Sequence, residues 1–364
     1  MNKWPTHRLP ALGALTLAIG SGVQAQERPI ADEILIAPCD GRCPFTLAVE
    51  VVAEVGHDAG PGMVDGLSNA VMDSSGRVYV VGREGVQVFA PDGTLLSAIG
   101  RPGEGPGEMG GSGGAFGFVE DGVFVMTDIA RRVIMRFDWE GKLLHEVRMS
   151  ELMQGAYLIP WDGTLAVHET TFYSPERIGY PLHLVDLATG EIEASFGSLT
   201  GEYDWDRERI QEVAPARGPD GTVWMARNHA YRIELWSPDN QLHLSMRRSL
   251  EWFPDALDDL DGHPLPTDPP EPRITGISAD DSLMWVMVHR AGEDWEEVDP
   301  RHFLERLDTH VEVIDWRRGQ VVASRRFDEP YLGWTGPGGL SAGIVTTGRG
   351  SVRNRVVRIR LSSW

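Results

Sequence analysis

The sequence predicts an all-β protein, a six-bladed β-propeller with four antiparallel strands in each blade. Three observations carry this prediction: a turn-and-strand pattern that recurs along the chain, a hairpin pattern that alternates with it, and an abundance of turn-forming residues. Of the 364 residues, 42 are glycine and 24 are proline. That composition favours many short strands joined by turns and disfavours a helical bundle.

The turn-and-strand pattern places a glycine or serine in a tight turn ahead of an apolar strand. The turn residues are Gly76, Gly122, Gly163, Gly221, Ser282 and Gly339. The hairpin pattern, two strands joined by a turn, occupies 86–96, 134–144, 182–192, 233–242 and 311–321. Together the two patterns give four strands in about 50 residues, which is the period of a propeller blade. A pair of β-sandwiches would not explain one hairpin pattern recurring along the whole chain.

Both ends of the chain indicate how the ring closes. The last unit ends at Trp364 after its third strand, and residues 45–56 form a strand near the start without a neighbour in sequence to pair with. We expect 45–56 to be a displaced fourth strand that completes the last blade beside 355–361 and covers the sheet edges. The propeller is expected to occupy 45–364 as a single domain.

The N-terminus has the features of a secretory signal peptide. Lys3 and Arg8 provide positive charge, an apolar stretch covers 9–19, and small residues precede a cleavage position after Ala25. The apolar stretch is shorter than the roughly 20 residues that span a bilayer. We expect residues 1–25 to be removed and residues 26–44 to form an N-terminal segment. The product should be soluble, periplasmic or secreted, and without a membrane span.

The two cysteines, Cys39 and Cys43, lie in that N-terminal segment. In an oxidising compartment a close pair of cysteines forms a disulfide. The alternative, a metal site, would need two further cysteine or histidine ligands nearby. The sequence therefore predicts a disulfide, no metal site and no other cofactor.

The formal net charge of −21 argues against a general affinity for nucleic acid, which requires a basic surface. Lysine is almost absent, so nearly all positive charge is arginine. We expect a monomer whose partner is a small molecule, a glycan or a peptide, with no nucleic-acid partner.

Several segments resemble the NHL-like six-bladed β-propellers of exported bacterial type. The strand Arg232–Trp236 is similar to the Arg-Ile-x-Val-Phe strand of that family, and the glycine-rich stretch 100–108 resembles its exported members. The resemblance covers almost the whole chain after the signal peptide, although blades 4 and 5 carry insertions and most blades lack an equivalent of Arg232. It implies the fold and not the function, because propellers include lyases, lactonases and binding platforms.

The long connections all fall on one face of the predicted propeller. In a four-stranded blade the second-to-third-strand loops and the crossings between blades lie on the same face. These are the connections that are long here: 101–114, 169–180, 197–211, 248–273 and 290–309. The last should hold a short helix with Asp299 as its N-cap. Since binding sites are built on loops held by a rigid scaffold, we predict an exported binding platform that uses this face.

Arginines and tryptophans near that face are the candidate ligand-binding residues. The arginines end or follow second strands, and the tryptophans lie in the long loops. The set is Arg83, Arg131, Arg227, Arg290, Trp205 and Trp295. Arginine binds carboxylates and phosphates bidentately, which points to an anionic small molecule, glycan or peptide. The alternative is that the arginines pair with nearby acids such as Glu84, Asp128 and Glu169 and only brace adjacent blades.

An enzyme is the alternative function. His168, His229 and His289 occupy equivalent positions on neighbouring blades and are the candidate catalytic residues of a lactonase or lyase at the central mouth. Such an enzyme would depend on histidine or on a divalent metal, although no set of metal ligands can be assigned. The sequence contains no P-loop and no zinc-binding H-E-x-x-H motif, and the glycine-rich stretch 100–114 precedes an expected strand rather than the helix that a nucleophile elbow requires.

Overall fold

The computed structural model describes most of the chain from Asp32 to Trp364. The described ranges are 32–39, 41–64, 69–82, 85–110, 113–120, 122–151, 155, 157–170, 176–198, 212–253, 269–299, 303–336, 340–346 and 352–364. The predicted signal peptide, Arg83 and Trp205 lie outside these ranges, so the predictions for them remain open. Within the described ranges, no helix is long and apolar enough to cross a membrane.

The first three sheets follow one another along the chain. Sheet I comprises β3 (Asn69–Met72), β4 (Val78–Gly82), β5 (Gly85–Phe89) and β6 (Leu95–Ile99). Sheet II comprises β7 (Gly113–Glu120), β8 (Val123–Asp128), β9 (Val133–Asp138) and β10 (Leu143–Arg148). Sheet III comprises β11 (Leu158–Pro160), β12 (Leu165–Glu169), β13 (Leu182–Asp186) and β14 (Ile192–Phe196).

Two of the other three sheets, IV and VI, include a strand from the start of the chain. Sheet IV comprises β15 (Val213–Arg217), β16 (Val223–Arg227), β17 (Arg232–Ser237), β18 (Gln241–Arg247) and β1 (Asp32–Leu35). Sheet V comprises β19 (Arg273–Ala279), β20 (Leu283–Ala291), β21 (Leu307–Asp315) and β22 (Gln320–Phe327). Sheet VI comprises β23 (Tyr331–Gly336), β24 (Leu340–Thr346), β25 (Val352–Ser362) and β2 (Thr46–Val55).

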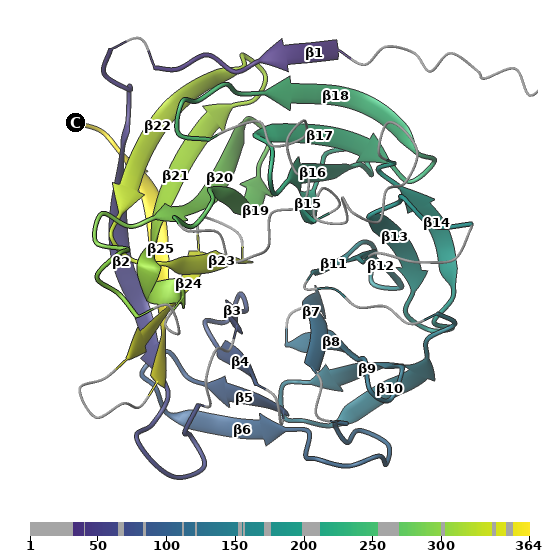
Figure 1. The fold of residues 1–364 in the computed structure, drawn as a ribbon. Helices are drawn as coiled ribbons and strands as arrows, with labels where there is room; N and C mark the ends of the chain where they lie inside the picture. Colours follow the sequence, from purple (N-terminus) through teal and green to yellow (C-terminus); the bar gives the residue numbers. More distant parts are fainter. Residues whose placement is uncertain are drawn as a thin grey trace, which may run out of the picture. The chain divides into compact units, whose positions relative to one another are not determined.

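The sheets are arranged around a common centre as a β-propeller. In Figure 1 the first strand of each sheet, β3, β7, β11, β15, β19 or β23, lies nearest the centre. First strands of neighbouring sheets contact one another, as β11 does with β7 and β15, and β19 with β15 and β23. The hairpin turns have the backbone that the sequence pattern requires, since Gly93, Gly141, Gly190, Asn240 and Gly319 all have positive φ.

The sequence predicted six blades of four strands each. Among the described residues five sheets have four strands, whereas sheet IV has a fifth strand, β1. Strand β1 pairs parallel with β18, from Asp32 opposite Leu244 to Leu35 opposite Arg247. All other strand pairs are antiparallel, as predicted. Residues 26–44 were expected to lie outside the propeller, whereas β1 belongs to one of its sheets.

The N-terminal strand closes sheet VI as predicted. Strand β2 pairs antiparallel with β25, from Thr46 opposite Ser362 to Val55 opposite Asn354. Its side chains pack on both sides of the sheet. Leu47 lies in the apolar cluster between sheets V and VI, and Val55 lies in the cluster between sheets VI and I.

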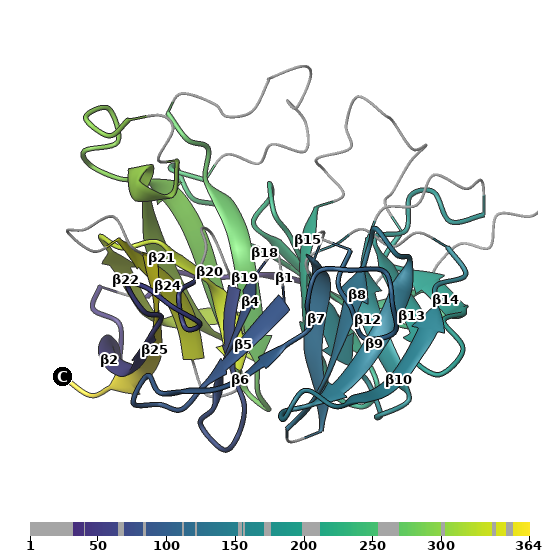
Figure 2. The same cartoon turned by 90° about the horizontal axis from the view of Figure 1, so that it is seen from below.

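The longer connections begin and end on one face, which we call the long-loop face. Their described parts are 56–64, 100–110, 149–151, 155, 157, 170, 176–181, 197–198, 212, 248–253, 269–272, 292–299 and 303–306. The opposite face carries tight turns such as 73–77, 161–164 and 280–282. In Figure 2 the 3-10 turn η2 (Phe303–Arg306) stands at the upper edge, beyond the ends of β20 and β21. The predicted short helix is this one turn, and Leu307 already belongs to β21.

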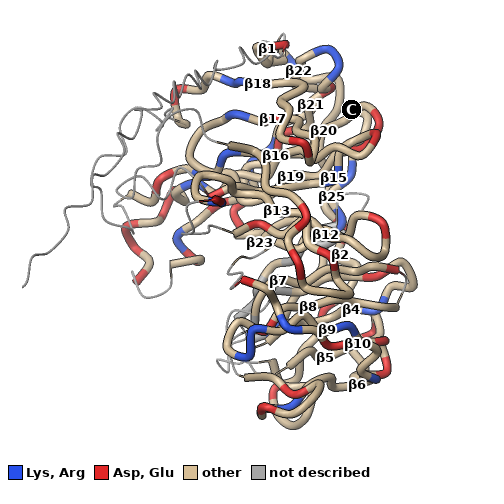
Figure 3. The backbone as a smooth tube through the Cα atoms, turned by 90° about the vertical axis from the view of Figure 1, so that its right-hand side faces the viewer, with Lys and Arg blue, Asp and Glu red and all other residues tan. Residues whose placement is uncertain are grey.

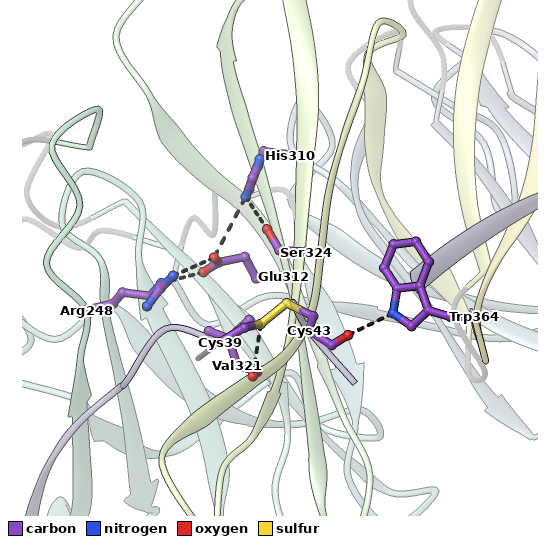
Figure 4. The surroundings of a disulfide bond; sticks show 8 residues. All are labelled: Cys39, Cys43, Arg248, His310, Glu312, Val321, Ser324 and Trp364. Atoms are coloured by element: carbon purple, nitrogen blue, oxygen red, sulfur yellow. Dashed lines mark hydrogen bonds and ion pairs between the residues drawn. A yellow bond between two sulfur atoms is a disulfide. The ribbon is translucent and has the colours of Figure 1, made fainter. Parts of the chain in front are cut away.

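The N-terminal segment crosses the outer edges of sheets IV, V and VI. Ile36 donates its backbone N–H to Arg247 O at 2.8 Å, and Ala37 donates to Gly319 O at 2.8 Å. Cys39 and Cys43 are joined by a disulfide, as predicted, beside β22 (Figure 4). The indole of Trp364 donates to Cys43 O at 2.8 Å, which connects the disulfide loop to the C-terminus.

Replacing both cysteines with serine should lower the free energy of unfolding by about 2 kcal/mol, the chain-entropy value for a loop this short. Urea unfolding of the wild type and the Cys39→Ser/Cys43→Ser variant measures the difference. Adding a reductant to the wild type should reproduce the loss and should leave the variant unchanged. Equal midpoints for the two proteins would contradict a stabilising disulfide.

A buried carboxylate joins sheets IV and V close to the N-terminal segment. Glu312 on β21 is 2% exposed. It accepts hydrogen bonds from Tyr231 Oη at 2.7 Å and from Arg248 Nη2 at 2.8 Å. Burial alone would raise the pKa of Glu312, but His310 and the Arg248 guanidinium hold that pKa below its usual value. Figure 4 shows Arg248 and His310 on either side of this carboxylate.

Glu312→Gln should destabilise the fold by about 3 kcal/mol, because it leaves the Arg248 charge buried without its counter-charge. A carboxyl with a lowered pKa stabilises the fold above its unfolded pKa, and the contribution is lost as pH falls through the folded pKa. Denaturant titrations from pH 7 to pH 3 should therefore show a steeper loss for wild type than for Glu312→Gln. The exposed Glu193→Gln on β14 is the matched control and should behave as wild type.

Candidate functional site

Arg131 braces the loops of sheet II. Its Nη2 donates to Glu146 at 2.8 Å, and its Nη1 donates to Glu108 O at 2.6 Å. Asp128, at the end of β8, is fully buried and accepts the backbone N–H of Gly110 at 2.6 Å. The guanidinium charge is therefore paired within the fold, but with Glu146 of the same sheet and not with Asp128 or across adjacent blades, as the bracing alternative expected.

Arg227, at the end of β16, is matched in the same way. It is 4% exposed, and its Nη2 donates to Glu234 on β17 at 2.9 Å. The same carboxylate accepts the Trp236 indole N–H at 3.0 Å and lies 2.7 Å from Arg232. A ligand would have to displace a buried ion pair to reach Arg227, at a high cost in desolvation.

Two of the candidate histidines are buried in seams between sheets. His168 on β12 is 0% exposed, and neither of its ring nitrogens has a hydrogen-bond partner among the described residues. Burial lowers the pKa of His168 to about 4. His289 on β20 lies 2.6 Å from Tyr331 O through Nε2, and burial lowers its pKa to about 4. Both imidazoles are neutral at pH 7. They have different surroundings, since His289 lies beside Tyr331 O and His168 has no hydrogen-bond partner among the described residues.

Arg290 and Trp295 lie on the long-loop face at the end of sheet V. The Arg290 guanidinium lies 4.6 Å from the ring centroid of Trp252. Burial, with help from Arg326, lowers the pKa of Arg290. The Trp295 ring lies beside Arg306, 5.1 Å from its guanidinium carbon. These two candidates are thus each part of an arginine–aromatic pair.

A different set of residues meets near the centre of the long-loop face. Tyr157 directly precedes β11, Glu212 directly precedes β15, and Arg273 opens β19. These are equivalent positions at the long-loop end of three neighbouring innermost strands. Glu169 and His229 lie beside them, and we call these five residues the inner rim. The candidates predicted from the sequence came from the ends of second strands, whereas Tyr157, Glu212 and Arg273 stand at the starts of first strands, which lie on the same face and nearer the centre.

Glu212 is the exposed acid of the inner rim. Its carboxylate lies 3.4 Å from His229 Nε2, and its side chain is 46% exposed. The hydrogen bond with His229 lowers the pKa of Glu212, and the Arg273 charge lowers it further. His229 is thus the one candidate histidine that the structure places in the inner rim.

Tyr157 supplies a phenol on the sheet III side of the inner rim. Its Oη donates to Thr275 O, on β19, at 2.7 Å, which ties sheet III to sheet V. Burial raises the pKa of Tyr157 to about 12, the Glu169 charge raises it as well, and Arg273 opposes the rise. The phenol remains protonated at neutral pH and acts as a donor.

Arg273 differs from Arg131 and Arg227 in its surroundings. Among the described residues it has no carboxylate within ion-pair distance and no hydrogen-bond partner. Its one ring contact is Phe303 of η2, at 5.9 Å. Its charge nevertheless affects the pKa values of Tyr157, Glu212 and His289. The guanidinium can therefore accept a carboxylate or phosphate from outside.

The inner rim combines a guanidinium, two carboxylates, an imidazole and a phenol. These groups can bind a polar ligand, and the His229–Glu212 pair could move a proton. In the described part of the chain, no three histidine, cysteine or acidic side chains are grouped as a metal site would require. Figure 3 shows basic and acidic positions interspersed along the backbone rather than gathered into a basic face.

Comparison with known proteins supports the fold. Neither a protein-family model nor a curated protein matches the chain. A member of the DUF4221 family from Bacteroides vulgatus is similar in structure, with a TM-score of 0.58 and 8% identity over 88% of this chain and 100% of that one. A Bacteroides fragilis protein proposed to be exported has a TM-score of 0.55 and 10% identity over 90% of this chain and 100% of its own.

A streptogramin B lyase is a weaker match, with a TM-score of 0.44 and 12% identity over 80% of this chain and 78% of that one. At these identities the similarities concern the propeller fold. They carry no statement about the activity of this chain.

The buried neutral histidines should make stability depend on pH. A histidine whose folded pKa is lowered destabilises the fold as pH falls from its unfolded pKa, near 6.5, towards 4, because the unfolded chain then binds more protons. For His168 the total effect is about 3 kcal/mol. His168→Leu should flatten the stability profile between pH 7 and pH 4.5 in urea titrations, with little change at pH 7. A profile as steep as that of wild type would contradict the assignment of His168 as neutral.

Proposed function

We propose that the chain is an exported six-bladed propeller that binds an anionic small molecule, glycan or peptide at the inner rim of its long-loop face. In this count sheet IV is the sixth blade, and β1 is an addition to its outer edge. Export to the periplasm or the medium is supported by the signal-peptide features of 1–25 and by the disulfide. The similar fold of the Bacteroides fragilis protein proposed to be exported is consistent with this location.

The observation that carries the proposal is the position of Arg273. Arg131 and Arg227, two of the arginines predicted from the ends of second strands, form ion pairs with Glu146 and Glu234 within the fold. Arg273 stands near the centre of the face with no such partner among the described residues. In a chain with a net charge of −21, a guanidinium left without a carboxylate on a face built of long loops is best explained by an anionic ligand.

Arg290 and Trp295 are proposed as outer contacts for a longer ligand such as a glycan or peptide. Arg290 also has no carboxylate at ion-pair distance among the described residues. Its stacking on Trp252 leaves the edge of the guanidinium available for a hydrogen-bonded anion. Arg131, Arg227, His168 and His289 are assigned to bracing and packing rather than to binding.

Arg273→Gln should weaken binding about 10- to 100-fold, the loss expected when one charged hydrogen-bonded pair is removed. Calorimetric titration with inorganic phosphate, glucuronate and short glycine peptides measures this on the full protein. Arg217→Gln is the matched control, because Arg217 is exposed at the opposite end of β15. The proposal fails if no probe binds wild type, or if Arg273→Gln binds every probe as tightly as wild type.

The second candidate function is a lyase or lactonase, and the His229–Glu212 pair is the observation that favours it. A carboxylate beside an imidazole can act as a general base or acid on a ligand held by Arg273. A binding platform predicts that a chelator leaves the thermal unfolding temperature unchanged and that bound probes are recovered intact. Loss of stability with a chelator, together with a divalent ion found by elemental analysis, would favour the enzyme.

A further inference from the structure

Two opposite charges of the inner rim, Arg273 and Glu212, lie near one another without forming an ion pair. The Arg273 charge lowers the pKa of Glu212, so the two groups are close enough to interact electrostatically. Their nitrogen and oxygen atoms are nevertheless beyond ion-pair distance. A half-buried arginine and an exposed glutamate that lie near one another would ordinarily form an ion pair, so their separation needs a structural cause.

The backbone holds the two residues at fixed positions. Asn228 N donates to Glu212 O at 3.0 Å, and Ile274 N, next to Arg273, donates to Asn228 O at 2.8 Å. The end of β16 therefore joins the start of β15 to the start of β19. Both charged residues begin innermost strands, where neighbouring sheets leave little room for the chain to shift.

The side chains have separate anchors as well. His229 Nε2 lies 3.4 Å from the Glu212 carboxylate and keeps it on the sheet IV side. The Phe303 ring lies 5.9 Å from the Arg273 guanidinium and keeps it beside η2. Among the described residues, Glu212 has no arginine or lysine within ion-pair distance, and Arg273 has no carboxylate within that distance. A cation and an anion are therefore presented at a set separation.

We propose that the inner rim binds a small zwitterion, with the ligand carboxylate on Arg273 and the ligand ammonium group on Glu212. Amino acids and short peptides have this chemistry. The ligand completes two ion pairs that the protein leaves open, and both charges become matched at the same time. Glu169, the second carboxylate of the inner rim, adds to the preference for a positive group. This inference rests on the proposed function and specifies its ligand.

Glycine oligomers test the inference because they vary the distance between the two charges without adding side chains. Calorimetric titrations with glycine, diglycine, triglycine and tetraglycine are compared with those of the N-acetylated forms. One of the free forms should bind wild type about tenfold or more tightly than its N-acetylated form, which keeps the carboxylate and loses the ammonium group. The preferred length reports the separation of the two charged groups.

Two variants separate the roles of the two charges. Glu212→Gln should abolish the preference for the free form and leave the affinity for the N-acetylated form unchanged. Arg273→Gln should weaken both forms about tenfold or more. Glu193→Gln and Arg217→Gln, both exposed and far from the inner rim, are the controls and should match wild type.

The outcomes distinguish this inference from the proposed function. Equal affinity for free and N-acetylated peptides, or binding of none of them, overturns the zwitterion inference. If phosphate or glucuronate still binds through Arg273 in that case, the proposed function stands. If Arg273→Gln changes no affinity, both fail. A preference for free peptides that persists in Glu212→Gln also overturns the inference, because the ammonium group is then bound elsewhere.

Discussion

The pairing of β2 with β25 is the constraint on which the rest of the propeller depends. Each sheet is apolar on both faces and must be covered on both by its neighbours. Strand β2 contributes Leu47 to the seam between sheets V and VI, and Ala53 and Val55 to the seam between sheets VI and I. If β2 were released, the ring would lose apolar contacts in two seams and leave an open edge on β25.

Closure of the ring also determines which partners the polar side chains between the sheets can have. A polar side chain in a seam cannot reach water, so its partners must come from the adjoining strands. Glu234 forms an ion pair with Arg227, and Glu312 accepts hydrogen bonds from Arg248 and Tyr231. The inner rim differs because its residues lie at the long-loop ends of the sheets, with Tyr157, Glu212 and Arg273 at the starts of innermost strands. There a charge can remain solvated, and Arg273 and Glu212 stay available for a ligand.

Most of the fold could be predicted because its signals are local and repeated. A turn glycine and an alternating strand fix each hairpin within a few residues, and the missing strand of the last blade identifies 45–56 as its complement. Strand β1 could not be predicted in this way. Its pairing with β18 is parallel and occurs once, and most of its residues are exposed, so no periodic apolar pattern marks it. A short helix was expected from the N-cap signal at Asp299, but only the turn Phe303–Arg306 forms. Leu307 pairs with Ala291 and therefore belongs to strand β21.

The sequence by itself determined the all-β class, the closure by the N-terminal strand, the disulfide and the face that carries the long loops. It also placed arginines and histidines near that face. Only the tertiary structure decided which of them are matched inside the fold, because the partner of an arginine comes from another strand or loop. Arg131 meets Glu146 and Arg227 meets Glu234, whereas Arg273 reaches the centre beside Glu212 without pairing with it. The spacing of residues along a chain does not contain these contacts, since they arise when strands distant in sequence are brought side by side.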